Sequence, residues 1–250
     1  MMQTLMKKHS ILRALLSLAA VVAVSSVGSA GTINLNDVYN GGNPFMGNNV
    51  MFTDTVETNG NPGDPATNFY QDPIVLGDTL TVNPVNFRAE VTPGPGLVAV
   101  DSQLETVIMS KNGTPITMIN FKELGDFDKL GNGFAKAELN YFFEILEVNG
   151  APVGSPITGN GTQLFDTSAG PNSGIWDLGF DLDLGAVAPG ATKVRFEFDN
   201  RLIAQAPDAL SLAFIAKKQI PGIRITVPEP SSVFGMLVGL GLMLVRRGRK

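Results

Sequence analysis

Apolar and polar residues alternate at every second position through the middle of this chain, and this alternation constrains the fold more than any other feature. Along 174–184, five apolar residues share one face and three aspartates share the other: Trp176, Leu178, Phe180, Leu182 and Leu184 against Asp177, Asp181 and Asp183. A period of two residues is that of a β-strand with one buried face. No helical period is sustained between 31 and 226. The chain is therefore predicted to be all-β.

Runs of this kind are separated by clusters of Gly, Pro and Asn, which are typical of turns. The predicted strands are 50–56, 79–91, 97–110, 115–121, 136–148, 174–184, 193–200, 210–217 and 223–227. The predicted loops are 41–49, 58–73, 149–161 and 168–173. Segment 134–148 is rich in Ala, Leu and Glu, so a helix stays open there, although its two-residue alternation favours a strand.

The number and spacing of these strands predict an antiparallel β-sandwich with a jelly-roll-like order. Asn112-Gly113, between two predicted strands, is the signal of a type I′ hairpin. Trp176 lies on the apolar face of its strand and is expected in the core. The predicted domains are a signal peptide over 1–30, the sandwich over 31–226 and a sorting tag over 227–250.

The body of the chain has no residue that supports thiol or imidazole chemistry. There is no cysteine, and the single histidine is His9, inside the predicted signal peptide. This excludes Ser-His-Asp triads, cysteine nucleophiles and the zinc, copper or haem sites that need such ligands. Without disulfides, packing has to hold the fold together.

Charge is also unevenly distributed. Between the two ends lie 11 Lys and Arg against 23 Asp and Glu, a net charge of −12. An acidic body argues against nucleic acid as a partner, because binding needs basic residues to neutralise phosphates. It leaves calcium open as a cation that acidic clusters could bind.

The first 30 residues have the three parts of a signal peptide. Lys7, Lys8 and Arg13 form a basic start, and an apolar run over 14–24 follows. Small residues then lead to Ala30, after which signal peptidase is expected to cleave. An uncleaved anchor helix is the alternative.

The last 24 residues hold three features in order. These are the motif Pro228-Glu229-Pro230, an apolar stretch over 231–245 and a basic tail of Arg246, Arg247, Arg249 and Lys250. A helix over 231–245 is roughly 22 Å long, and the basic tail favours the cytoplasmic side, so the tail predicts a stop to export. This order resembles the PEP-CTERM sorting signal of Gram-negative bacteria that make exopolysaccharide.

The resemblance implies an exosortase, a membrane peptidase that acts near the Pro-Glu-Pro motif, as a partner. It also implies a protein exported to the cell surface or extracellular matrix and anchored in the membrane at least transiently. An ordinary single-pass anchor is the alternative and would also place the body outside. The segment 193–230 resembles the end of many proteins with this tag, through Asp199-Asn200, the Ala-rich strand 213–216 and Lys217-Lys218. That likeness implies fold and sorting class, and no activity.

Three acidic clusters are weak candidates for calcium. Asp126 and Asp128 precede Gly131-Asn132-Gly133 but lack the spacing of a calcium loop. Asp181 and Asp183 share one strand face, and the third cluster surrounds a polar loop and consists of Asp54, Glu57 and Asp64. Solvated faces and turns explain acidic residues of this kind equally well.

The sequence leaves three functions open. The leading hypothesis is a structural or interaction protein of the cell surface or matrix, without catalysis. The alternative is an exopolysaccharide-binding module, for which Tyr39 and Tyr70, near predicted loops, are the candidate contacts. A secreted glycoside hydrolase is third, because it needs only a pair of carboxylates, and an acidic body provides such pairs by chance.

Overall fold

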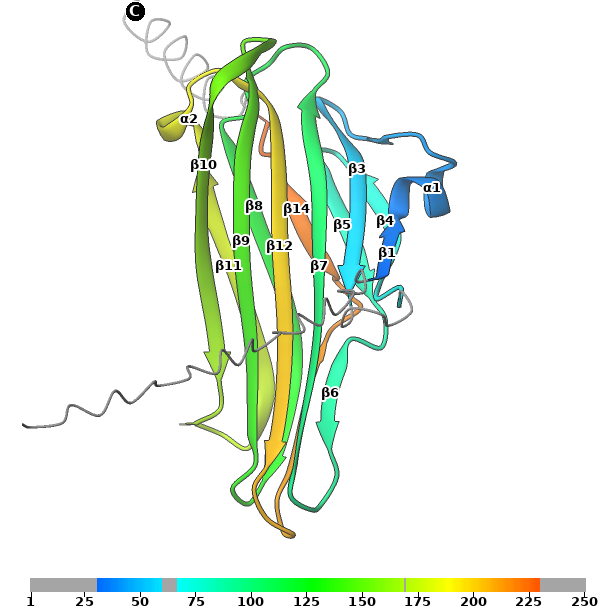
Figure 1. The fold of residues 1–250 in the computed structure, drawn as a ribbon, viewed down its shortest axis with the longest axis vertical. Helices are drawn as coiled ribbons and strands as arrows, with labels where there is room; N and C mark the ends of the chain where they lie inside the picture. The colour runs from blue at the N-terminus through cyan, green and yellow to red at the C-terminus, as the bar shows by residue number, and fades with distance from the viewer. Residues whose placement is uncertain (1–30, 60–66, 169, 230–250) are drawn as a thin grey trace, which may run out of the picture.

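A computed structural model describes residues 31–59, 67–168 and 170–229 of the chain. They form two seven-stranded sheets packed face to face in an elongated sandwich (Figure 1). Every pairing between strands is antiparallel, which confirms the predicted all-β sandwich. The predicted signal peptide and C-terminal membrane helix lie outside the described residues.

Sheet A has the strand order β1-β3-β7-β12-β9-β10, with β2 paired to β3. Its strands are β1 (Gly31–Asn34), β2 (Phe45–Met46), β3 (Val50–Asn59), β7 (Gly96–Ser110), β9 (Phe134–Val148), β10 (Ala151–Asp166) and β12 (Ala191–Ala206). The four long strands β7, β12, β9 and β10 run the length of the molecule (Figure 1). Because β9 is a strand, the helix left open for 134–148 is excluded.

Sheet B has the order β4-β5-β14-β8-β13-β6, with β11 on the other side of β8. Its strands are β4 (Tyr70–Leu76), β5 (Thr79–Pro84), β6 (Arg88–Val91), β8 (Met118–Leu130), β11 (Ser173–Asp183), β13 (Leu212–Lys217) and β14 (Ile223–Thr226). One edge of β8 pairs with β14 over 120–122 and with β13 over 125–130. Sheet B is therefore divided on that side into an upper and a lower half.

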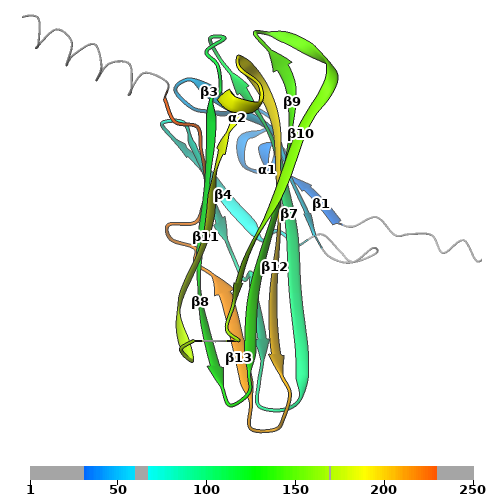
Figure 2. The ribbon, with the colours of Figure 1, turned by 90° about the vertical axis from the view of Figure 1, so that its left-hand side faces the viewer.

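Two short helices, α1 (Leu35–Asn40) and α2 (Leu184–Val187), complete the described elements. Neither is long or apolar enough to cross a membrane, and the described residues contain no other helix. The core lies between the two layers, which Figure 2 shows edge on. Trp176 is 1% exposed and belongs to this core, as its strand face predicted.

The predicted strand 79–91 is wrong in one respect, because it is broken into β5 and β6. Asn86, between them, has a φ of 57°, a left-handed conformation that interrupts an extended strand. The two pieces then pair differently, β5 with β4 and β14, and β6 with β13. This break lies at the division of sheet B.

The predicted loop 149–161 is also wrong, since most of it belongs to β10. Its glycines suggested a loop, but two of them lie directly opposite aromatic residues of β9: Gly159 faces Phe143 and Gly161 faces Tyr141. A Cβ at either glycine would come within 2.4 Å of the facing ring. The glycines thus make room for rings that cover the strand, a known way to stabilise glycine in a sheet.

The predicted hairpin at Asn112-Gly113 is not formed. Gly113 has a φ of 70°, as a tight turn needs. However, β7 before it belongs to sheet A and β8 after it to sheet B, so the two strands do not pair. The turn passes the chain from one layer to the other.

Candidate functional site

Three buried polar side chains from both sheets meet in the interior, and we call them the Glu–Lys–Asn centre. Glu123 lies on β8, Lys217 ends β13, and Asn200 comes from β12 in the opposite sheet. The Lys217 Nζ atom lies 2.5 Å from Glu123 Oε2. The Lys217 and Glu123 side chains are 0% and 1% exposed, and Asn200 is fully buried. The Asn200 amide lies close enough to Glu123 to lower the pKa of its carboxyl.

The alternation of each strand explains why these residues face inward. On β13 the buried positions are Ala213, Ile215 and Lys217. On β12 the inward face runs Phe196, Phe198 and Asn200. On β8 it runs Phe121, Glu123 and Gly125. In each strand, a polar residue occupies a position of the apolar face. Sequence reasoning missed this signal, although the period of two displays it.

Burial governs the protonation of the pair. Desolvation raises the pKa of the Glu123 carboxyl, and the attraction of Lys217 only partly opposes it. Desolvation likewise lowers the pKa of the Lys217 amine. Both shifts favour the neutral acid and the neutral amine.

The Glu–Lys–Asn centre also contains two acceptor atoms without a hydrogen-bond partner. Glu123 Oε1 and Asn200 Oδ1 are buried and have no hydrogen-bond partner among the described residues. Neither oxygen can donate while Glu123 is ionised, and unpaired buried acceptors are costly. A proton on Glu123 would make this carboxyl a donor and remove one of the two unpaired acceptors.

Aromatic rings enclose the amine. Lys217 Nζ lies 5.2 Å from the ring centre of Phe87 and 5.3 Å from that of Trp176. Gly125 makes room for the indole, since a Cβ there would lie 2.0 Å from Trp176 Cε2. Rings at this distance stabilise a cation and exclude water.

Tyr70, predicted as a carbohydrate contact, is instead part of this interior. It is 0% exposed, so that prediction is wrong. Its hydroxyl donates to the Ser102 carbonyl oxygen at 3.2 Å and accepts from Asn200 Nδ2 at 3.3 Å. Desolvation raises the pKa of the Tyr70 hydroxyl well above its ordinary value of 10.0. The alternation of β4 turns this tyrosine inward.

Glu57, predicted near a calcium loop, is a second buried carboxylate. Its oxygens accept from the backbone N–H groups of Phe69 and Tyr70, at 3.0 and 3.1 Å, and from the Ser102 hydroxyl at 2.9 Å. These donors satisfy it without a metal. Asp64, predicted beside it, lies outside the described residues.

Tyr39, the other predicted carbohydrate contact, is half-buried at the end of α1 and packs against the core. Its hydroxyl lies 2.8 Å from the Asn68 side-chain amide in a hydrogen bond. No residue of the described structure forms an aromatic platform with it, because all the described Phe, Tyr and Trp side chains are buried or half-buried.

The acidic candidates for calcium are dispersed. Asp126 and Asp128 lie within β8 and not in a loop, and Asp126 Oδ2 is 3.9 Å from Lys218 Nζ. On β11, Asp181 accepts from Asn120 Nδ2 at 2.6 Å, and Asp183 caps α2 by accepting from the Ala186 N–H. Among the described residues, no group of three or more acidic or histidine side chains could hold a metal ion.

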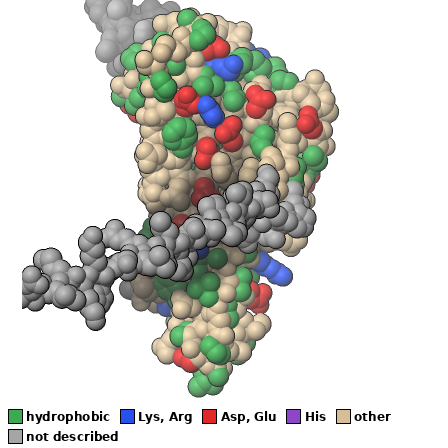
Figure 3. Space-filling model, in the orientation of Figure 1, with side chains coloured by type: hydrophobic (Ala, Val, Ile, Leu, Met, Phe, Trp, Pro, Cys, Tyr) green, Lys and Arg blue, Asp and Glu red, His purple; other side chains and the backbone are tan. Residues whose placement is uncertain are grey.

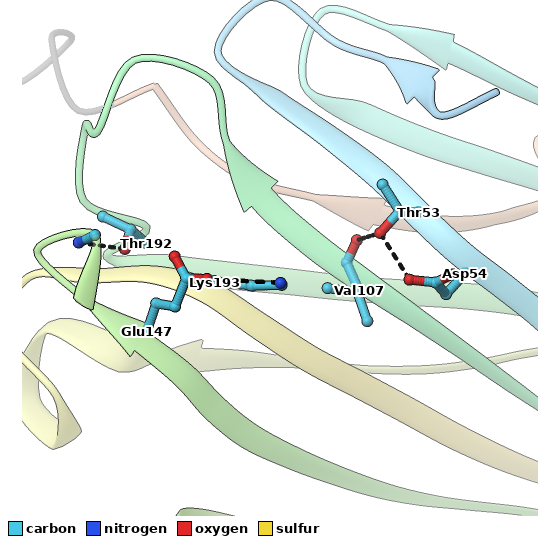
Figure 4. Close-up of polar contacts among 7 residues, drawn as sticks. Thr53, Asp54, Val107, Glu147, Thr192 and Lys193 are labelled. Atoms are coloured by element: carbon cyan, nitrogen blue, oxygen red, sulfur yellow. Dashed lines mark hydrogen bonds and ion pairs between the residues drawn. The ribbon is translucent and has the colours of Figure 1, made fainter. Parts of the chain in front are cut away.

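The outer face of sheet A carries basic and acidic side chains close to one another (Figure 3). Three of the four ion pairs described on this face cross between strands, as Lys193 and Glu147 do at 3.6 Å (Figure 4), and Lys136–Glu138 lies within β9. Asp54, the remaining calcium candidate, accepts from the Thr53 hydroxyl at 3.2 Å on β3.

Glu197 lies directly opposite Glu105, and desolvation and this neighbour raise the Glu197 pKa.

Two hollows lie on the outer face of sheet B. One, of about 300 Å³, includes Asp177 and Asp181 among its lining residues. These carboxylates are four residues apart on one strand, about 13 Å by strand geometry, wider than the ~5–10 Å of glycosidases. The other, of about 230 Å³, lies at the division of the sheet and is lined by Arg88, Phe214 and Gln219, among others.

The start of the predicted sorting motif directly follows the last strand. β14 ends at Thr226, and the Val227 N–H donates to the Asp78 carbonyl oxygen at 3.0 Å. Pro228 is half-buried and Glu229 exposed. Pro230, Ala30 and the basic tail lie outside the described residues.

No family model and no curated protein matches the chain. Among solved structures, TmCBM61 in complex with beta-1,4-galactotriose is similar at 6% identity and a TM-score of 0.23, over 60% of this chain and 71% of that one. The VP2 subviral particle of infectious bursal disease virus gives 12% and 0.25, over 76% and 56%. Tailspike protein 4 of bacteriophage CBA120 gives 13% and 0.20, over 72% and 20%. Likenesses this low carry no functional argument.

Proposed function

We propose that this chain is an exported structural protein of the cell surface or extracellular matrix, sorted by an exosortase-type peptidase and without catalytic turnover. The observation that carries the proposal is the place of the motif. β14 is the last described strand, the Val227 N–H donates to the Asp78 carbonyl oxygen, and Glu229, two residues on, is exposed. A peptidase could thus cut there without unfolding the sandwich.

The composition of the surface supports the same proposal. Most of the described aromatic side chains pack in or against the core, and the outer face of sheet A carries four ion pairs. A protein of this kind stays soluble through its charge and functions by being displayed. The jelly-roll-like order and the flanking signal and membrane helices belong to this proposal as well.

Cell fractionation tests the sorting. The full chain is expressed in a bacterium that has an exosortase, as wild type and as Pro228→Ala/Pro230→Ala. We expect the wild type in the surface or matrix fraction and the variant held in the membrane. Pro93→Ala, at an exposed proline in the connection from β6 to β7, is the matched control. Equal distribution of all three proteins would refute the role of the motif.

One observation keeps exopolysaccharide binding as a second candidate. The hollow of about 230 Å³ combines a half-buried ring, Phe214, with the polar side chains of Asn86, Arg88 and Gln219. Sites for small ligands combine apolar surface and a few polar groups in this way. Binding of the full chain to the host exopolysaccharide, lost in Phe214→Ala and kept in Tyr39→Ala, would favour it.

A further inference from the structure

The Glu–Lys–Asn centre contains the groups needed for a covalent cross-link. We propose that Lys217 Nζ and Asn200 Cγ become joined by an intramolecular isopeptide bond, with Glu123 transferring the protons. The bond would connect β13 of sheet B to β12 of sheet A. It does not depend on the proposed surface function.

The first argument is proximity. Glu123 relates the two reacting groups, because its Oε2 atom is 2.5 Å from Lys217 Nζ and the Asn200 amide lies close enough to lower the pKa of the same carboxyl. Groups held in this way react as if at very high concentration. The amide nitrogen, Asn200 Nδ2, is in turn held by the Tyr70 hydroxyl at 3.3 Å.

The second argument is the protonation state. An amine attacks only when neutral, and burial favours that form of Lys217. A protonated Glu123 would be a donor in the interior where Asn200 Oδ1 has no hydrogen-bond partner. A hydrogen bond formed between them during the reaction would polarise the amide carbonyl, as an oxyanion-stabilising donor does.

The reaction balances without any co-reactant. One proton first passes from the Lys217 ammonium to the Glu123 carboxylate. The amine lone pair then forms the N–C bond to Asn200 Cγ, and the carbonyl π electrons move onto Oδ1. As they return, the Cγ–Nδ2 bond breaks, and Glu123 carries one proton from Nζ to Nδ2, so that Nδ2 leaves as ammonia. The proton that Glu123 took up in the first step then passes to the ammonia. The products are a secondary amide, ionised Glu123 and ammonium.

The third argument is the enclosure. Phe87 and Trp176 lie over the amine, and its side chain is 0% exposed. Exclusion of water prevents the solvation of the amine and the hydrolysis of the carbonyl group. Elsewhere on the described chain, the lysines that form ion pairs are partly exposed, such as Lys193 at 28%.

The bond would suit a chain that has no cysteine for disulfides. Lys217 precedes Pro228 by 11 residues, and only β14 lies between them. A pulling force from a C-terminal anchor could detach β14 from its sheet. The covalent bond at Lys217 would then resist further unfolding. Covalent closure also restricts the unfolded state, as a disulfide does.

Tryptic peptides of the full chain test the bond directly. Without it, trypsin releases the linear peptides 196–201 and 202–217, since Arg201 and Lys217 are cleavage sites. With it, cleavage after Lys217 is blocked, and 196–201 appears only in a branched peptide lighter than its parts by one ammonia, about 17 Da. We expect the linear peptide 196–201 to be lost.

Variants assign the roles. Glu123→Gln and Lys217→Met should each restore linear 196–201, whereas Lys218→Met, one residue away and partly exposed, should keep the branched peptide. If a variant does not fold, the digest of the wild type alone decides whether the bond is present. Linear 196–201 at full yield would overturn the proposal, and so would a linear peptide that has lost ammonia, which indicates a succinimide at Asn200.

Discussion

The interior and the outer face of sheet A both carry Lys or Arg beside Glu, in opposite surroundings. Lys217 and Glu123 are 0% and 1% exposed, whereas Arg195 and Glu144 are 38% and 21% exposed. The outer pairs keep part of their hydration and are screened by salt, so each contributes little. The inner pair has lost its hydration and depends on its partners.

This difference in exposure determines how much each ion pair affects the free energy of unfolding. A buried ion pair is rarely better than an apolar pair of the same volume, so its presence does not by itself stabilise the fold. Removing one partner is expensive, however, because the other stays buried. The inner pair is therefore a point of vulnerability, and the outer pairs are replaceable.

The largest effect should come from removing one inner partner. Lys217→Met leaves the Glu123 carboxyl buried without its partner, which should lower the free energy of unfolding by about 3–5 kcal/mol, and by more if the isopeptide bond is lost too. Arg195→Met, its outer counterpart, should cost less than about 1 kcal/mol. Urea unfolding of both variants measures the two values. Equal losses would contradict the comparison.

A smaller difference in stability should separate variants of Tyr70 and Tyr39, the two tyrosines predicted to contact carbohydrate. Tyr70→Phe removes a buried hydroxyl and leaves the Ser102 carbonyl oxygen and Asn200 Nδ2 without it, at a cost of about 1–3 kcal/mol. Tyr39→Phe removes a hydroxyl in a half-buried position and should cost about 1 kcal/mol or less. Thermal unfolding of both variants gives the order. The reverse order would mean that Tyr70 is not held as described.

Most of the fold could be predicted from the sequence because alternation is a local signal. The predicted strands 97–110, 136–148 and 174–184 are confirmed within a few residues by β7, β9 and β11. The wrong predictions concern segments whose amino-acid composition suggests a loop or a single strand but whose pairing with neighbouring strands decides otherwise. Gly159 belongs to a strand only because Phe143 on its neighbour covers it.

The candidate site could not be predicted, because its three residues are far apart in the sequence. Glu123, Asn200 and Lys217 meet only when β8, β12 and β13 face one another across the core. Their inward register is a local signal, but which strands face one another is not. Asn200 and Lys217 stood out in the sequence only through resemblance, within Asp199-Asn200 and Lys217-Lys218.

The smallest effect concerns pH and the outer face. Desolvation, Glu105 and Asp199 raise the pKa of Glu197 above its ordinary value of 4.5, while Arg195 opposes the shift. A raised folded-state pKa means that the folded protein binds the proton more tightly than the unfolded one. The stability that this group contributes is thus complete below 4.5 and is lost as pH rises through the folded pKa.

Glu197→Gln isolates this contribution. The variant should be more stable than the wild type at pH 7, and the difference should shrink as the pH falls toward 4.5. Above pH 4.5, Asp166 and Asp208 do not interfere, because hydrogen bonds from Ser168 and Ser211 lower their pKa values from 3.8. Urea unfolding at pH 5, 6 and 7 measures the difference. A difference that is constant with pH would show that Glu197 acts on this face by packing and not by charge.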